Sequence, residues 1–207
     1  GLRAAGVRRV RVLPLSPQYS PTTTASVADA VAAAAAGLQV ELLHDYHTDA
    51  GWAAAVADSI RAHWAAHGRG ERLLLSFHGI PRRLVDGGDP YADQCEASAR
   101  AIAVALGIRR DELLLTFQSR FGRERWLEPY TQPTLEALAR EGVRRVDVVC
   151  PGFAVDCLET LEEISVENDA AFRAAGGEVL RYIPCLNAGG AHADALAALA
   201  RGDAGWA

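Results

Sequence analysis

The sequence predicts an α/β fold in which parallel sheets are flanked by helices. Its apolar segments are short and continuous, as in strands buried on both faces of a parallel sheet. Helical stretches separate these segments, and this alternation is typical of βαβ units. A third observation suggests two similar lobes, because the segment 2–12 is echoed at 138–148 with the same Gly-Val-Arg-Arg-Val string.

The elements follow from these patterns in chain order. We expect strands at Val7–Leu15, Leu73–Phe77, Leu113–Phe117, Val143–Cys150 and Val179–Ile183. We expect helices at Thr24–Ala36, Ala50–His67, Tyr91–Leu106, Pro133–Arg140 and Cys157–Ala175, where apolar residues recur at helical spacing or a Ser/Thr-rich cap precedes the helix. Three parts result: 1–68 as the end of an incomplete first lobe, 69–185 as the second lobe, and 186–207 as a C-terminal helix packing back on the first lobe.

Composition excludes several classes of protein. Half of the 207 residues are hydrophobic and the formal net charge is −5, which is ordinary globular composition rather than that of a disordered chain or a disulfide miniprotein. The mixed, mildly acidic charge gives no polycationic footprint for nucleic acid. The chain contains no Met and begins with Gly1, so we expect the natural N-terminus to lie upstream.

Four cysteines stand at 95, 150, 157 and 185, and no pair has C-x2-C spacing. We expect buried, reduced thiols in an intracellular, cytoplasmic protein. A cluster built from the four is the alternative.

His78 closes the strand Leu73–Phe77 and is followed by Gly79 and Pro81, which place it on a short turn. Ligands of α/β sheets bind at the carboxyl ends of strands. A neutral imidazole there can ligate a metal or accept a proton, whereas a structural histidine would bond to the backbone.

An acidic stripe follows a later strand. Glu159, Glu163 and Glu167 are spaced i, i+4 and i+8, so they share one helix face, and Asp156 begins the stripe. Like charges at this spacing destabilise a helix slightly. The stripe is therefore either a solvated face or a ridge that binds cations or passes protons.

The segment Thr116–Thr131 interleaves arginines, hydroxyls and aromatic side chains. Such a loop can hold a flat ligand that bears carboxylates, with arginine forks on the acids. It can equally be a lid that packs on its own core.

Six strings stand in order along the chain: PLSPQYSPTTTAS at 14–26, SFHGIP at 76–81, GDPY at 88–91, FQSRFGRERWLEPYT at 117–131, CPGFAVDCLETLEEI at 150–164 and IPCLN at 183–187. By these strings, which cover most of the chain from Val10 to Asn187, the chain resembles the ferrochelatase family, whose members insert Fe(II) into protoporphyrin to form haem. The resemblance is strongest to the proteobacterial branch. The family usually has a bulkier residue at Ser16 and Gly at Ala25.

The resemblance implies two Rossmann-like lobes of the chelatase type, with His78 and Glu159 as catalytic and metal-binding groups on opposite sides of the porphyrin. Insertion must remove two pyrrole protons and strip water from the metal, so a base and a metal ligand are both needed. By the resemblance His78 accepts a proton and can hold iron, and Glu159 binds iron or relays protons.

The remaining site residues also follow from the resemblance. Glu163, Glu167 and Asp156 form a relay for protons or metal, and the porphyrin pocket includes Tyr19, Ser119 and Arg120. Iron is a substrate here and not a prosthetic group. The cysteines do not match the iron–sulfur cluster that some members carry.

The implied partners are porphyrin and ferrous iron, without nucleic acid, and peripheral membrane contact is left open. Rival interpretations within the fold are a coproporphyrin chelatase and a cobalt chelatase. Outside enzymology, the chain could be a porphyrin- or metal-binding protein without turnover. A generic two-lobed ligand-binding protein would have the loops 76–81 and 156–167 facing away from each other.

Overall fold

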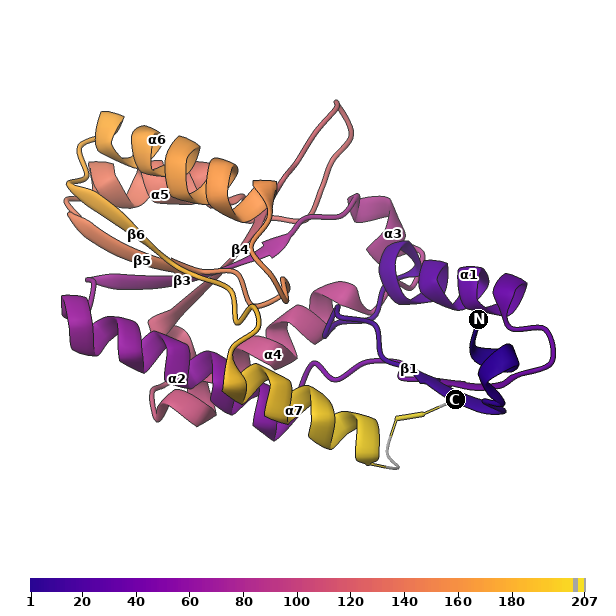
Figure 1. The fold of residues 1–207 in the computed structure, drawn as a ribbon. Helices are drawn as coiled ribbons and strands as arrows, with labels where there is room; N and C mark the ends of the chain where they lie inside the picture. The colour runs from indigo at the N-terminus through magenta and orange to yellow at the C-terminus, as the bar shows by residue number, and fades with distance from the viewer. Residues whose placement is uncertain (203–204, 207) are drawn as a thin grey trace.

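A computed structural model describes residues 1–202, 205 and 206, and it has the predicted α/β architecture (Figure 1). The strands are β1 (Arg9–Val12), β2 (Gln39–Leu42), β3 (Arg72–His78), β4 (Leu113–Gln118), β5 (Arg145–Val149) and β6 (Val179–Ile183). The α-helices are α1 (Ser26–Ala34), α2 (Ala50–His67), α3 (Arg82–Asp86), α4 (Tyr91–Leu106), α5 (Thr131–Arg140), α6 (Asp169–Ala174) and α7 (Gly190–Arg201). The described residues also form two short 3-10 helices, η1 (Leu2–Ala5) and η3 (Arg110–Glu112), and two π-helices, η2 (Pro21–Ala25) and η4 (Glu159–Asn168).

Both sheets are parallel, as predicted. β1 pairs with β2, and a separate four-stranded sheet has the order β4-β3-β5-β6. In Figure 1, α5 and α6 cover one face of the larger sheet, whereas α2 and α4 lie on the other face. Side chains of β3 alternate between these two layers, since successive residues of a strand point to opposite faces. Leu73, Leu75 and Phe77 join the core under α2 and α4, and Leu74 joins the core under α5 and α6.

The order of the strands places a switch in direction at the carboxyl ends of the larger sheet. The chain passes from β3 to β4 on one side, and then crosses to β5 on the other side of β3. The carboxyl ends of β3 and β5 therefore form a topological switch point, where open α/β sheets bind their ligands. His78 is the last residue of β3.

Two long helices have the bounds that the sequence predicts. The Asp49 carboxylate accepts a hydrogen bond of 2.8 Å from the N–H of Trp52 and so caps the start of α2. Gly107 ends α4 in the left-handed conformation, as glycine after a helix commonly does. The two glycines of the internal echo, Gly6 and Gly142, also have positive φ values of 78° and 96°.

Several elements differ from the sequence predictions, among them β2, β1 and the acidic segment. β2 was not predicted, because its four residues alternate polar and apolar side chains and lack a continuous apolar run. β1 is shorter than Val7–Leu15 and is not buried on both faces in the described residues, since it alternates between exposed and partly buried positions. The acidic segment forms the π-helix η4 before it continues as α6, whereas we expected one α-helix over Cys157–Ala175.

The helix α2 packs mainly on the helices α4 and α7, and it also touches β6 of the larger sheet. A division of the chain at residue 68 therefore separates α2 from the elements it packs against. The three-part division stays a prediction, and residues 203, 204 and 207 of its last part lie outside the described residues.

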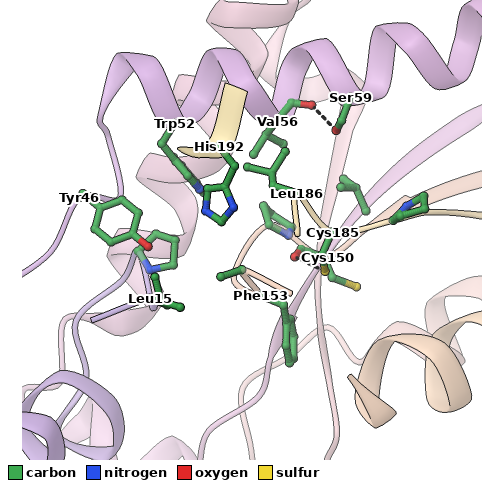
Figure 2. A pocket seen from close by; sticks show the side chains of 15 residues that line it. Leu15, Tyr46, Trp52, Val56, Ser59, Cys150, Phe153, Cys185, Leu186 and His192 are labelled. Atoms are coloured by element: carbon green, nitrogen blue, oxygen red, sulfur yellow. Dashed lines mark hydrogen bonds between the residues drawn. The ribbon is translucent and has the colours of Figure 1, made fainter. Parts of the chain in front are cut away.

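Hydrogen bonds join the end of α7 to β1. The Arg11 guanidinium of β1 donates to the backbone oxygens of Ala200 and Gly202 at 3.0 and 2.8 Å. Trp206 forms an isolated antiparallel bridge with Leu43, which follows β2. Figure 2 shows a small cavity whose lining includes Leu15, Trp52 of α2, Phe153 and His192 of α7. Among the described residues, no helix is both long enough and apolar enough to cross a membrane.

Candidate functional site

The ring of His78 has a defined hydrogen bond. Its Nδ1 lies 2.6 Å from the backbone oxygen of Gly79. A carbonyl oxygen can accept but not donate, so Nδ1 carries the proton in the neutral ring. This leaves the lone pair on Nε2, which is the atom that can take a proton or bind a metal.

Aromatic side chains flank this imidazole. The ring centroids of Phe153 and Trp126 lie 6.2 and 6.3 Å from that of His78. A cavity of about 490 Å³ opens beside them, and its lining comes from three segments. They are η2 (Thr22, Thr23), the β3 turn with α3 and the start of α4 (His78, Gly79, Ile80, Pro81, Arg83, Tyr91), and the following loop (Phe121, Glu124, Trp126).

The turn itself is tightly packed at Gly79. A Cβ atom there would lie 2.9 Å from the backbone oxygen of Gln118 and 3.1 Å from the indole of Trp126. The Gly79 N–H donates to that same Gln118 oxygen at 2.8 Å. A larger residue would therefore push the turn away from β4 and disturb the His78 ring.

The arginine-rich loop packs on this turn. Leu127 N donates to Ile80 O at 3.0 Å, and Arg82 N donates to Arg125 O at 2.9 Å. Trp126 is buried, and its indole N–H has no hydrogen-bond partner within the described residues. The loop therefore forms one wall of the His78 cavity, which agrees with the alternative that it packs as a lid.

The π-helix η4 begins beside His78. Gln118 pairs with His78 in the register of β3 and β4, and its side-chain Nε2 donates to the backbone oxygen of Glu159 at 2.7 Å. A hydrogen bond from the Cys157 thiol is the largest cause of the lowered pKa of Glu159; its own backbone N–H lowers the pKa further, and so does His78 when it is protonated. Gln118 thus links the strand end at His78 to the start of the segment 156–167, which differs from the arrangement that a generic ligand-binding protein would require.

In the π-helix, acidic residues four positions apart still lie near one face of the helix. Each π turn includes one more residue than an α turn, so residues four apart still lie near one face. Such helices are rare and occur frequently at functional sites. Glu163 accepts hydrogen bonds of 2.6 Å from both the N–H and the hydroxyl of Ser119, whose φ of 64° lies in the left-handed region. Glu167 is exposed.

Asp156 has a different environment from the three glutamates. One of its oxygens accepts from the Tyr182 hydroxyl at 2.6 Å and the Cys185 N–H at 3.0 Å, and the other accepts from the Asn187 side chain at 2.7 Å. Burial opposes ionisation, but these hydrogen bonds lower the pKa of Asp156. The carboxylate therefore joins the η4 loop to the segment after β6, and its place in a relay stays a prediction.

The three predicted porphyrin-pocket residues lie apart from the His78 cavity. Tyr19 stacks on His44 with a centroid distance of 4.2 Å. Ser119 and Arg120 line a second cavity of about 270 Å³ together with Glu163 and Tyr130. In the described residues none of the three lines the His78 cavity, so their role also stays a prediction.

Sequence reasoning did not assign roles to Gln118 and Tyr91, although both lie in matched strings. Gln118 is buried in a polar cluster, where its side-chain oxygen accepts from the Ser76 hydroxyl at 2.7 Å. A glutamine at the end of an otherwise apolar strand was the available signal. Tyr91 begins α4, and its hydroxyl donates to the backbone oxygen of His78 at 2.9 Å.

Comparison with known proteins decides the family. A sequence profile described as Ferrochelatase matches residues 1–204. The chain belongs to the ferrochelatase family.

Individual relatives agree with this membership. The chain is 59% identical over 203 residues to a ferrochelatase of Xanthomonas axonopodis pv. citri, covering 97% of this chain and 64% of that protein. It is 60% identical to a ferrochelatase of Stenotrophomonas maltophilia, with 96% and 63% covered. A third, from Xylella fastidiosa, is 56% identical, with 97% and 63% covered. The chain thus spans about two thirds of the length of these relatives or slightly less.

The fold also has a solved counterpart. The structure of SirB from Bacillus subtilis with Fe3+ superposes with a TM-score of 0.67 at 12% sequence identity. The match covers 97% of this chain and 75% of that one. At this identity the likeness concerns the fold alone, and it agrees with the predicted chelatase-type architecture.

Proposed function

We propose that the protein inserts ferrous iron into protoporphyrin, with His78 and Glu159 as the reacting groups. One observation carries the proposal. His78, with its lone pair on Nε2, stands at the topological switch point, and Gln118, its neighbour on β4, binds the main chain of Glu159, the first residue of the acidic helix. Membership of the family supports the same activity.

The reaction exchanges two pyrrole protons for one Fe(II) ion, so charge is conserved. Nε2 of His78 accepts the first proton when the macrocycle lies in the adjoining cavity. Glu159 binds the hydrated iron and helps to replace its water ligands, because carboxylates and imidazoles both suit Fe(II). The second proton leaves along Glu163 and Glu167 to solvent.

An incomplete ligand set suits iron that is a substrate. Within the residues that the structure describes, no group of three or more His, Cys, Asp or Glu side chains converges to hold a metal. Two ligands, His78 and Glu159, would leave the remaining coordination positions to water and then to pyrrole nitrogens. A closed set of four protein ligands is typical of structural metals that are retained.

The finer assignments belong to the same proposal. Arg120 lies over the ring of Tyr130, where its guanidinium is exposed and can pair with a substrate carboxylate. Tyr19 and Ser119 complete the predicted porphyrin pocket. Free cysteines at all four positions support a reducing, cytoplasmic location. The mildly acidic charge supports a protein that does not bind nucleic acid.

The test is metal insertion by the purified protein. Anaerobic Fe(II) and, separately, Zn(II) are mixed with protoporphyrin or coproporphyrin, and the metalloporphyrin is measured by absorbance or fluorescence. We expect turnover with both metals and faster turnover with protoporphyrin. Porphyrin binding without insertion would contradict the proposal in favour of a non-catalytic binding protein. Faster turnover of coproporphyrin would contradict the assigned substrate.

A further inference from the structure

The peptide that joins His78 to Gly79 is held at both of its polar groups. Its oxygen accepts the 2.9 Å hydrogen bond from the Tyr91 hydroxyl. Its N–H donates to Gln118 O at 2.8 Å. The plane of this peptide is therefore fixed from two directions.

The orientation of this peptide plane determines the position of the carbonyl oxygen that binds the His78 imidazole. The next carbonyl, that of Gly79, takes the Nδ1 proton of His78. Rotation of the peptide would move that carbonyl relative to the ring and weaken the bond that keeps the proton on Nδ1. The restraint that Tyr91 applies to the backbone thus reaches the ring and its tautomer.

Asp89 connects Tyr91 to another wall of the cavity. One carboxylate oxygen accepts from the Tyr91 N–H at 3.0 Å, and the other accepts from the Ser20 hydroxyl at 2.7 Å. Asp89 is buried, so both bonds lie in a low-dielectric environment that strengthens them. Ser20 caps η2, and residues 22–23 of that helix line the same cavity as His78.

We propose that Asp89 and Tyr91 are positioning residues that couple the segment 20–23 to the orientation and tautomer of the His78 ring. The proposal rests on the proposed function, because it takes Nε2 of His78 as the atom that meets the substrate. Tyr91 acts in it through His78 and not by chemistry of its own. A change in the segment 20–23 would thereby alter the orientation of Nε2 of His78 toward the substrate.

A matched pair of variants tests the role of Tyr91. Tyr91 and Tyr46 are 6% and 5% exposed, but the Tyr46 hydroxyl has no hydrogen-bond partner within the described residues. For Tyr91→Phe we expect kcat for zinc insertion to fall about 10-fold, because a misdirected catalytic group costs rate. KM for porphyrin should stay within about two-fold, since ground-state binding is retained. Tyr46→Phe should change neither. Equal kcat values for the two variants would overturn the proposal.

A second readout does not depend on turnover. Nitrogen-15 spectra of protein labelled at its six histidines distinguish the two neutral tautomers, and His78→Asn identifies the signal. We expect His78 to carry its proton on Nδ1 in the unaltered protein and to populate both tautomers in Tyr91→Phe. An unchanged signal in Tyr91→Phe would refute the coupling even if the protein proved inactive, so failure of the proposed function remains distinguishable.

The link to the cavity wall is tested by a double-mutant cycle. Ser20→Ala removes the hydroxyl that Asp89 accepts. If the wall acts through Tyr91, the losses in kcat from Ser20→Ala and Tyr91→Phe should be less than additive, because both break one connected path. Additive losses would show that segment 20–23 is not coupled to His78 through this pair.

Discussion

The turn after β3 and the helix after β5 each carry one of the two proposed reacting groups, but they restrain them differently. The His78 ring is bonded to the backbone of its own turn, and that turn is bonded to Tyr91. Glu159 is held at its main chain, where Gln118 binds its carbonyl oxygen, and the Cys157 thiol lies beside its carboxylate. The carboxylate itself is only partly buried.

This difference fits two different tasks. A base that removes a proton from a macrocycle lying in a fixed plane gains from a fixed direction of its lone pair. A carboxylate that passes on a metal ion gains from freedom to follow it. The comparison therefore predicts that rigidity matters most around His78 and that charge matters most along η4.

Replacement of Glu159 should have the largest effect on the acidic side. Glu159→Gln keeps the size of the side chain and the backbone bond to Gln118 but removes the charge. We expect metal insertion to fall by about 10²-fold or more, as for loss of an acid–base group, while porphyrin binding is retained. Zinc insertion and porphyrin fluorescence quenching measure the two quantities. Unchanged insertion would remove Glu159 from the proposed mechanism.

The next two glutamates should differ from Glu159 and from each other. Glu163→Gln weakens the two bonds that hold Ser119, so we expect a loss of about 1.5 kcal/mol in the free energy of unfolding and a smaller loss of activity than for Glu159→Gln. The exposed Glu167 is the matched control, and Glu167→Gln should change stability by less than about 0.5 kcal/mol. Denaturant unfolding measures the free energy of unfolding, and zinc insertion measures the activity. Equal and complete loss of activity in all three variants would contradict a graded relay.

Much of this arrangement can be read from the sequence, because it depends on local patterns. The bounds of α2 and α4 follow from apolar spacing, and the structure places the caps Asp49 and Gly107 at those bounds. His78 at a strand end and the acidic stripe from Glu159 are visible in the same way. The two segments lie at the same end of the larger sheet because they follow neighbouring parallel strands.

Other features depend on contacts between distant segments. A spacing of four residues fits one face of both α- and π-helices, so the form of η4 could not be predicted from Glu159 and Glu163. The tautomer of His78 depends on the position of the Gly79 carbonyl, and this position depends on Tyr91 thirteen residues away. The predicted pocket residue Tyr19 stacks on His44, a pairing that no sequence pattern signals.

Replacement of Asp156 should have a smaller effect on the free energy of unfolding, and this effect should depend on pH. Its pKa is lowered in the folded protein, so the carboxylate contributes stability above its unfolded pKa of about 3.9 and loses that contribution as the pH falls through the folded value. Asp156→Asn should therefore destabilise the protein by about 1 kcal/mol at neutral pH, and the difference should shrink below about pH 4. The exposed Asp194→Asn is the control. A difference that does not depend on pH would contradict this account.

Replacement of Cys157 should have the smallest effect, which is a change in the pKa of Glu159. Its thiol is the main cause of the lowered pKa of Glu159, so Cys157→Ala should move that pKa up toward its ordinary value. Carbon-13 NMR titration of the glutamate carboxyls measures the shift, with Glu159→Gln to identify the signal. An unchanged titration would show that the thiol does not stabilise the carboxylate.

The central claim is that His78 supplies the base for metal insertion, and His78→Asn tests it most directly. Asparagine keeps some size and polarity but has no lone pair that can take a proton near neutral pH. Zinc-porphyrin formation and porphyrin binding are measured side by side on the purified variant. We predict retained binding, because apolar contacts over a large flat ring supply most of the affinity, and insertion reduced by about 10²–10⁴-fold. Normal specific activity per folded molecule would contradict the claim and leave the acidic helix as the remaining candidate.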